Sequence, residues 1–312
     1  NFVGNKINLT GGDGLVMIGV KGGYFERNVS YHANFLGRSG TANVGMWPIS
    51  SSDIVMQYNE AAYCHLANGG ADGEGFDIDI GCRNILFRYN YSRASEGGGI
   101  LLCNTGGQVT LCDEDGNVRK DENGKVVIEK GRAEWSDVFI KNNVFARNGK
   151  KKGNFPALMH VAGSCENVYF ENNTVIFTDN VSQPLMTVTK WDSEYDSSSP
   201  NKFYFKNNVF LSPVPNESYL RYTYMGEDYL FLSNVYYNMS ESFAEVASDT
   251  KAFSFDPLIG IPDDAKGYEK IYDYVPGERK CSEGALLLKG RNLYDAAGNK
   301  VTGRRYFGAI VA

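Results

Sequence analysis

Cysteine and histidine are scarce in this sequence, whose 312 residues include six cysteines and three histidines. The cysteines are too sparse for a domain held together by disulfides, and they form none of the CxxC pairs typical of structural zinc sites. Cys103 and Cys112, which flank a short loop, are the one pair that suggests a disulfide. We therefore expect neither a disulfide scaffold nor a zinc framework.

An excess of positive charge and long apolar runs are lacking as well. Lys and Arg number 31 against 37 Asp and Glu, which gives a net charge of −6. Nucleic-acid surfaces depend on clustered Lys and Arg, so we expect no nucleic-acid partner. No apolar stretch approaches the roughly 20 residues that a helix needs to cross a bilayer, so we expect no membrane-spanning segment. The GxSxG elbow of one class of serine hydrolases is also absent.

The sequence contains instead a repeated phrase: an apolar residue, two or three β-formers, a polar residue and then Asn. The phrase recurs every 25 to 35 residues, apart from one interval of 53. No amphipathic helical segment of about 10 residues separates the copies, which excludes helical repeats and βαβ units. The copies are VSYHAN (29–34), IVMQYN (54–59), ILFRYN (85–90), VFIKNN (138–143), VYFENN (168–173), FYFKNN (203–208) and the weaker YLFLSN (229–234).

Apolar residues lie five and three positions before most of the closing Asn residues, as Ile85 and Phe87 do before Asn90. This period of two predicts a strand with one face inward, and short strands at this spacing predict an all-β fold of parallel coils, a β-helix. We expect a single domain over residues 1–312, with coils from about 15 to 255. Because an Asn side chain satisfies turn backbone groups and Asn tolerates positive φ, the closing Asn residues predict a stacked ladder.

Three stretches interrupt the repeat. Residues 104–136 contain two turn signals, DG at 115–116 and NG at 123–124, and predict a protruding β-hairpin or a two-hairpin loop. Residues 193–201 and 213–228 are further polar or proline-bearing insertions. Insertions at corresponding points of a solenoid gather on one side, where they can wall a groove.

With phrases such as VFIKNNVF and ILFRYNYS, the chain resembles the secreted right-handed parallel β-helix proteins of the pectin-lyase-like superfamily. The segments FDPL (255–258), LYDAAGN (293–299) and FGA (307–309) are similar to the closing segment of such proteins, here about 256–312. The resemblance implies a right-handed coil, a secreted, periplasmic or cell-surface location and a glycan partner, and we expect a monomer. Such proteins include hydrolases, lyases, esterases, epimerases and adhesins. Members usually carry N-terminal coils and a cap, which we expect to be missing before Asn1.

The segment GADGEGFDIDIG at 70–81 has the highest density of acidic residues. A strand here would bury Phe76, Ile78 and Ile80 and place Asp77 and Asp79 outward on one face. In the next coil, EGGG at 96–99 precedes an apolar strand in the same way. We therefore expect the first residue of that segment, Glu96, about one strand spacing, roughly 4.8 Å, from the acidic group.

Several carboxylates within about 5 to 9 Å are what glycoside hydrolysis needs, because one must stay protonated as the acid while another is ionised. We predict Asp77 and Asp79 as the central catalytic pair, with Glu96 or Glu74 as partner, and leave the assignment of acid and nucleophile open. The predicted function is a secreted enzyme that hydrolyses a polysaccharide or oligosaccharide in a groove along an outward sheet.

The same carboxylates admit other chemistry. In a calcium-assisted lyase, Asp77, Asp79 and Glu96 would hold Ca²⁺ against a substrate carboxylate. The candidate bases that would remove the proton next to that carboxylate are Arg83, Arg88, Arg93 and Lys141. The outward position two before each Asn carries mixed charges, which favours a hydrolase over a polyuronate lyase. A calcium site that only stiffens the coil, a solvated acidic turn and a non-catalytic glycan-binding or adhesive β-helix also remain open. We expect no cofactor other than this Ca²⁺.

Further residues are predicted to bind the substrate because of their chemistry and their place in these coils. Basic residues and histidines can hydrogen-bond to a sugar, and an indole ring suits the apolar side of a pyranose, although core packing is an equal alternative for each Trp. The predicted substrate-binding residues are Asp72, His65, Arg88, Arg93, Lys141, His160, Trp135 and Trp191.

Overall fold

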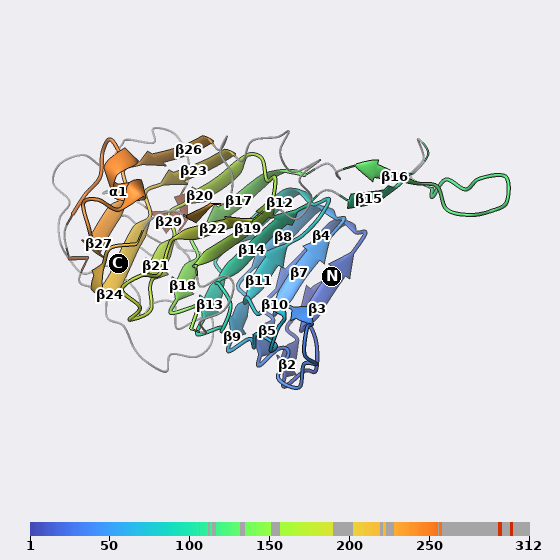
Figure 1. Ribbon diagram of the computed structural model, residues 1–312, viewed down its shortest axis with the longest axis horizontal. Helices are drawn as coiled ribbons and strands as arrows, with labels where there is room; N and C mark the ends of the chain where they lie inside the picture. Colours follow the sequence, from blue (N-terminus) through green and yellow to red (C-terminus); the bar gives the residue numbers. More distant parts are fainter. Residues whose placement is uncertain are drawn as a thin grey trace.

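The computed structural model describes residues 1–105, 107–111, 113, 117–131, 135–150, 157–189, 202–218, 221–222, 228–254, 256–257, 293–294 and 300–301. The described chain winds into stacked coils whose strands form three parallel sheets (Figure 1). We call the three sheets A, B and C. Along the chain, each full coil contributes one strand to sheet C, then one to sheet A and then one to sheet B. The predicted parallel β-helix is confirmed.

In each sheet, neighbouring strands come from successive coils of the stack. Sheet A contains β1 (Phe2–Val3), β4 (Lys21–Glu26), β8 (Ser52–Gln57), β12 (Arg83–Arg88), β17 (Ser136–Lys141), β20 (Val168–Glu171), β23 (Lys202–Lys206) and β26 (Asp228–Leu232). Sheet B contains β2 (Lys6–Asn8), β5 (Val29–Tyr31), β9 (Glu60–Ala62), β13 (Tyr91–Arg93), β18 (Val144–Ala146), β21 (Thr174–Ile176), β24 (Val209–Asn216) and β27 (Val235–Met239). Sheet C contains β3 (Leu15–Ile18), β7 (Met46–Ile49), β11 (Phe76–Ile78), β14 (Ile100–Asn104), β19 (Met159–Gly163), β22 (Met186–Thr189) and β25 (Arg221–Tyr222).

The core consists of the side chains that the three sheets turn inward. Phe87 of β12 lies in register with Met56 of β8 and Ile140 of β17, and all three are fully buried. The inward positions predicted from the period of two are thus confirmed. Trp135 belongs to the same core and is 5% exposed, so it takes the packing alternative and not a sugar-binding position.

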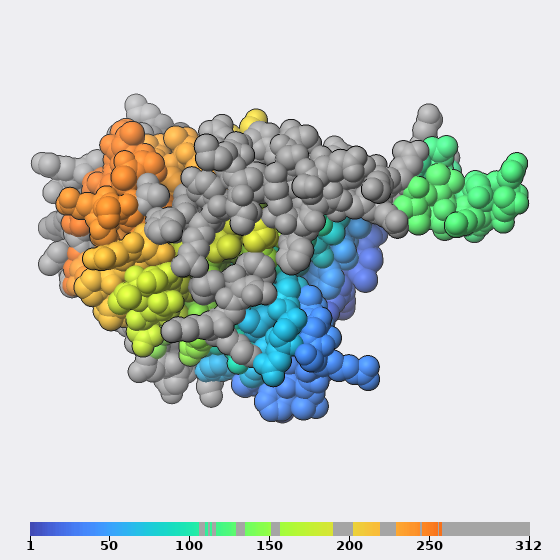
Figure 2. Space-filling model, in the orientation of Figure 1, coloured from blue at the N-terminus to red at the C-terminus, as the bar shows by residue number. Residues whose placement is uncertain are grey.

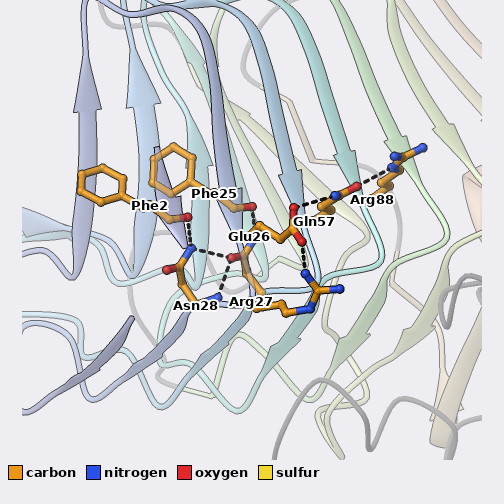
Figure 3. Close-up of polar contacts among 8 residues, drawn as sticks. Phe2, Phe25, Glu26, Arg27, Asn28, Gln57 and Arg88 are labelled. Carbon is orange, nitrogen blue, oxygen red and sulfur yellow. Dashed lines mark hydrogen bonds and ion pairs between the residues drawn. The ribbon is translucent and has the colours of Figure 1, made fainter. Parts of the chain in front are cut away.

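A ladder of Asn side chains follows the corner between sheets A and B. In each rung, the backbone N–H and Nδ2 of one Asn donate to Oδ1 of the Asn in the next coil, and Nδ2 also donates to a carbonyl of the preceding coil (Figure 3). The ladder begins at Asn5, whose backbone N–H and Nδ2 donate to Oδ1 of Asn28. The rungs that follow are Asn28, Asn59, Asn90, Asn143, Asn173, Asn208 and Asn234. At the last rung the acceptor is the carboxylate of Asp249, which follows α1 (Ala244–Ser248).

The ladder differs from the sequence expectation in one coil. Asn34, which closes the phrase at 29–34, is not a rung; the rung in this coil is Asn28. The strand before Asn28 is β4, in which Gly23 takes the place of the apolar residue expected five positions before the Asn. Because glycine has no apolar side chain, the segment that ends at Asn28 does not match the repeated phrase. The phrase at 29–34, which matches it instead, contains β5 of sheet B and no strand of sheet A.

The longest described insertion is a β-hairpin between β14 and β17. It is formed by β15 (Gly107–Thr110) and β16 (Ile128–Gly131), which pair antiparallel, and it projects from the body of the coils (Figures 1 and 2). This confirms a predicted hairpin. Cys103 before it is a free thiol, so the expected disulfide is wrong; Cys112 lies outside the described residues.

Two short strand pairs complete the structure: β6 (Ala42–Asn43) pairs with β10 (Ala71–Asp72), and β28 (Leu293–Tyr294) pairs with β29 (Lys300–Val301). Residues 193–201 and most of the expected closing segment 256–312 lie outside the described residues. Within the described part of the chain, no helix has the length and apolarity needed to cross a membrane.

Candidate active site

Acidic side chains gather along the outer face of sheet C. The short strand β11 turns Phe76 and Ile78 into the core, where both are fully buried, and places Asp77 on the opposite face. Asp79 follows one residue after the strand ends, and its backbone N–H still donates to the carbonyl of Pro48. The strand predicted at the acidic segment is therefore present, although Asp77 is only 3% exposed.

Asp72 reaches this group from β10, the short strand before β11. Its neighbour Gly73 has φ of +85°, which allows the chain to turn toward β11 at a position that an L side chain would strain. Asp13 approaches from an earlier coil, where its Oδ1 accepts hydrogen bonds from the backbone N–H of Val44 (2.8 Å) and from Nε1 of Trp47 (2.9 Å). Two coils, that of β3 and that of β11, thus supply the acidic group.

Burial and mutual repulsion keep protons on these carboxyl groups. Burial, followed by the charges of Asp79 and Asp13, raises the pKa of Asp72 to about 7. Burial and the charge of Asp72 raise the pKa of Glu74 to about 8. The pKa of Asp77 lies well above the ordinary range, again mainly because of burial, with the charge of Asp79 as the next cause.

Asp79 differs from the other carboxyl groups in its hydrogen bonds. Burial raises its pKa, but the backbone N–H of Ile80 donates to Oδ1 at 2.6 Å and the thiol of Cys103 also donates, and both bonds lower the pKa. Hydrogen bonds to a carboxylate favour its ionised form. The two hydrogen bonds thus offset part of the effect of burial on the pKa of Asp79, whereas no hydrogen bond is among the causes that shift the pKa of Asp72.

The side chains of Glu74 and His160 lie close to each other. Glu74 is fully buried, His160 is 1% exposed, and Nδ1 of His160 lies 3.8 Å from Oε1 of Glu74. Burial lowers the pKa of His160 to about 3, while that of Glu74 is raised, so both groups are neutral at pH 7. The contact is between uncharged groups and is not an ion pair.

Sequence reasoning missed one polar residue of this face. Thr187 of β22 lies in register with His160 of β19, and His160 lies in register with Leu101 of β14, the partner of Asp77. Thr187 is 8% exposed. The register between these strands depends on how the chain closes coils of unequal length, and the sequence alone did not supply it. Asp13 was missed for the same reason.

Glu96 does not face the acidic group. Its coil aligns as expected, since the N–H of Gly97 donates to the carbonyl of Gly73. However, Oε2 of Glu96 accepts a hydrogen bond from the N–H of Leu66 (2.8 Å), and Oε1 lies 3.5 Å from Nδ1 of His65. A Cβ at Gly97 would clash with the Asp72 backbone, so this glycine serves contact between coils.

His65 also forms part of a second polar cluster, on the sheet B side. Its Nε2 lies 3.1 Å from Nδ1 of His32. Nearby, Arg93 of β13 is buried, and its Nε donates to Oε1 of Glu60 at 2.8 Å. His65 therefore contacts Glu96, and Arg93 forms an ion pair with Glu60. Neither contact involves Asp77 or Asp79.

Arg88 and Lys141 lie on the outer face of sheet A. Nε of Arg88 donates to Oε1 of Gln57, and Nζ of Lys141 lies 3.2 Å from Oε2 of Glu171 (Figure 3 shows the contact of Arg88). Neither cation belongs to the sheet that carries the acidic group. Trp191 lies outside the described residues.

The expected calcium ligands are not brought together. Among the residues that the structure describes, no three or more His, Cys, Asp or Glu side chains are arranged to hold a metal ion. Asp77, Asp79 and Glu96 therefore do not form a metal site, because the side chain of Glu96 turns to His65 and Leu66.

Comparison with known proteins gives a partial likeness. Part of the chain is similar to a lacto-N-biosidase of Bifidobacterium longum subsp. longum, 31% identical over 112 residues, which is 32% of this chain and 7% of the relative's length. The chain thus matches only a small part of a far longer protein. No protein-family model matches the sequence. The relative is a glycosidase by name.

Proposed function

We propose that this protein is a glycoside hydrolase in which Asp72 and Asp79 are the two catalytic carboxyl groups. One observation carries the assignment: of the carboxyl groups on this face, Asp77 and Glu74 are almost fully buried, whereas Asp72 and Asp79 are half-buried. Asp13 is half-buried too, but its Oδ1 is already held by hydrogen bonds from Val44 and Trp47. A catalytic group must reach the scissile bond. Of the pair expected from the sequence, Asp79 is retained, and Asp72 takes the place of Asp77.

The environments of the two carboxyl groups assign their roles. Asp72, whose pKa of about 7 is raised by burial and by the charge of Asp79, is protonated in part at neutral pH and is the general acid. Asp79 accepts hydrogen bonds from Ile80 and Cys103 and is the ionised nucleophile or base. Glycoside hydrolysis needs two carboxyl groups whose pKa values differ in this way. Asp77 keeps the surroundings of Asp79 water-poor and acidic.

The charge of the site favours a neutral glycan over a uronic-acid glycan. An anionic sugar would meet the charge of Asp79 and the partly ionised Asp72, whereas the cations that a lyase could use, Arg88 and Lys141, lie on sheet A. The name of the partial relative makes a lacto-N-bioside the first glycan to test. We further propose that the enzyme is secreted, which suits a glycan substrate and the resemblance of its coils to pectin-lyase-like proteins.

The decisive experiment is digestion of a glycan panel, including p-nitrophenyl lacto-N-bioside, by the wild type and by Asp72→Asn and Asp79→Asn. We expect products heavier by one water, with kcat lower by a factor on the order of 10³ in either variant. Asp53→Asn is the matched control, because Asp53 is exposed on β8 of sheet A and its activity should equal that of the wild type.

Each rival function has its own result in the same experiment. Unsaturated products that absorb in the ultraviolet would establish a lyase and reject the hydrolase. Binding without turnover on every glycan would favour an adhesive β-helix. Turnover that persists in both Asn variants would move the catalytic site elsewhere.

A further inference from the structure

One tryptophan lies on the same outer face as the proposed catalytic pair. Of the three tryptophans, Trp135 is packed in the core and Trp191 lies outside the described residues. Trp47 belongs to β7, where Met46 and Pro48 on either side of it turn inward and are buried. The indole of Trp47 therefore points outward, and it is half-buried, so part of its surface is open to a ligand.

Trp47 is next to the acidic group in the register of sheet C. Strand β7 pairs with β11, and the register places Trp47 beside Asp77 on the outer face. The carbonyl of the following residue, Pro48, accepts a hydrogen bond from the N–H of Asp79 at 3.1 Å. The strand adjacent to β11 thus brings an accessible aromatic ring beside the carboxyl group proposed as nucleophile or base.

A hydrogen bond fixes the position of the indole. Nε1 of Trp47 donates to Oδ1 of Asp13 at 2.9 Å. The same oxygen accepts from the N–H of Val44 at 2.8 Å, which holds the carboxylate itself in place. Asp13 is near enough to Asp72 and Asp79 for its charge to raise the pKa of both. Because the one polar atom of the indole is already bonded, the side chain offers a ligand its apolar ring.

This ring differs from the outward aromatic rings on sheet A. There the rings of Phe139, Tyr169 and Tyr204 stack on one another with centroids 5.0 and 4.9 Å apart, so neighbouring rings cover their faces. In sheet C, the register neighbours of Trp47 are an aliphatic and an acidic residue. Among the residues that the structure describes, no aromatic ring stacks on Trp47, which leaves the ring for stacking on a ligand.

The face of an aromatic ring suits one class of ligand at this place. The C–H groups on one side of a pyranose form an apolar patch that can lie flat on an indole, while the hydroxyl groups point to the rim. An indole that is held by its N–H loses little freedom when a sugar binds, so the contact is pre-organised. The neighbouring carboxyl groups would repel a uronic acid, which favours a neutral sugar.

We propose that Trp47 stacks on a pyranose ring of a neutral glycan, next to the glycosidic bond that lies at Asp72 and Asp79, and that Asp13 holds the indole for this contact. This inference rests on the proposed function, because it places the stacked sugar beside that pair. It makes Trp47 a substrate-contacting residue, and it gives the hydrogen bond between Trp47 and Asp13 a role in binding.

The test compares Trp47→Phe with Trp47→Leu. Both substitutions remove the N–H that bonds to Asp13 and keep an apolar side chain, and only phenylalanine retains a ring face. With a p-nitrophenyl glycoside that the wild type cleaves, we expect KM to rise by about tenfold in Trp47→Leu and by less than about threefold in Trp47→Phe. Since stacking is equal in the bound substrate and the transition state, kcat should be nearly unchanged in both.

Tyr24→Leu is the matched control on another sheet. Tyr24 is an outward aromatic side chain of β4 on sheet A and is 46% exposed, and we expect this variant to have the KM and kcat of the wild type. A raised KM in Tyr24→Leu would place the glycan on sheet A and overturn the proposal. An equal rise of KM in Trp47→Phe and Trp47→Leu would assign the effect to the hydrogen bond with Asp13 and would overturn stacking.

Equilibrium binding separates this inference from the proposed function. Calorimetry with lacto-N-biose measures Kd for the wild type and both Trp47 variants, whether or not the protein cleaves a glycan. Weaker binding in Trp47→Leu, with most of the affinity kept in Trp47→Phe, supports the proposal even if the wild type hydrolyses nothing. Equal Kd and KM in all three proteins would overturn the proposal and leave hydrolysis by Asp72 and Asp79 intact. Absence of any binding or turnover in the wild type would overturn both.

Discussion

Two rows of buried polar side chains cross the same coils, and they differ in one respect. In the Asn ladder each amide is saturated: Asn143 donates to Asn173 and to the carbonyl of Phe87, and it accepts two bonds from Asn90. On the outer face of sheet C, no side chain among the described residues donates a hydrogen bond to either carboxyl oxygen of Glu74. Both rows are buried, so burial does not distinguish them; the difference is whether the protein itself supplies the partners.

The comparison teaches how to separate scaffold from site in a solenoid. A row whose donors and acceptors are all hydrogen-bonded within the protein stabilises the fold and has no free donor or acceptor for a ligand. A row with unsatisfied atoms costs stability in the free protein, and proteins commonly keep such sites because they serve function. Substitutions in the two rows should therefore change the free energy of unfolding in opposite directions.

The largest effect is expected in the ladder. Asn143→Ala removes the acceptor of Asn90 and the donor to Phe87, and it leaves buried backbone groups unsatisfied. We expect it to lower the free energy of unfolding by about 3 to 5 kcal/mol, measured by chemical denaturation. The control is the adjacent Asn142→Gly, because Asn142 has φ of +57° and glycine keeps that conformation. An equal loss in both variants would mean that the ladder contributes nothing specific.

The ladder was also the part that the sequence predicted best, and the reason is physical. A strand and its turn are local, so the alternation around Ile85, Phe87 and Asn90 indicates both the inward face and the corner. The prediction failed where Gly23 removed a side chain from the pattern, which moved the expected rung from Asn28 to Asn34, and it did not include the rung at Asn5.

The site was predictable only in part, because it depends on contacts between coils. The motif around Asp77 and Asp79 indicated the correct strand, but the sequence could not show that Asp77 is buried while Asp72 remains accessible. Glu96 has the expected place in the backbone, yet its side chain turns to His65, a choice that no local pattern determines. Thr187 shares this face of sheet C only through the register of the strands.

A smaller effect of the opposite sign is expected on sheet C. Burial raises the pKa of Glu74 from 4.5 to about 8, so the folded protein binds a proton that the unfolded chain releases in this range. The contribution of Glu74 to stability is therefore greatest below about pH 4.5 and falls as the pH rises to about 8, by an amount on the order of a few kcal/mol. In Glu74→Gln this fall should shrink, which denaturant titrations at about pH 5 and pH 8 would reveal. An unchanged pH dependence in Glu74→Gln would show that Glu74 is ionised or solvated in the folded protein.

The smallest effect is expected on sheet A, where the polar side chains are partnered but partly exposed. Glu171 and Lys141 form an ion pair at 3.2 Å, with side chains 27% and 30% exposed. Water screens such a pair, so Glu171→Gln should change the free energy of unfolding by less than about 1 kcal/mol and leave kcat/KM unchanged. It is also the matched Glu-to-Gln control for Glu74, since both substitutions remove one carboxylate. A loss of activity in Glu171→Gln would place the glycan on sheet A and would remove the contrast between the two faces on which the site assignment depends.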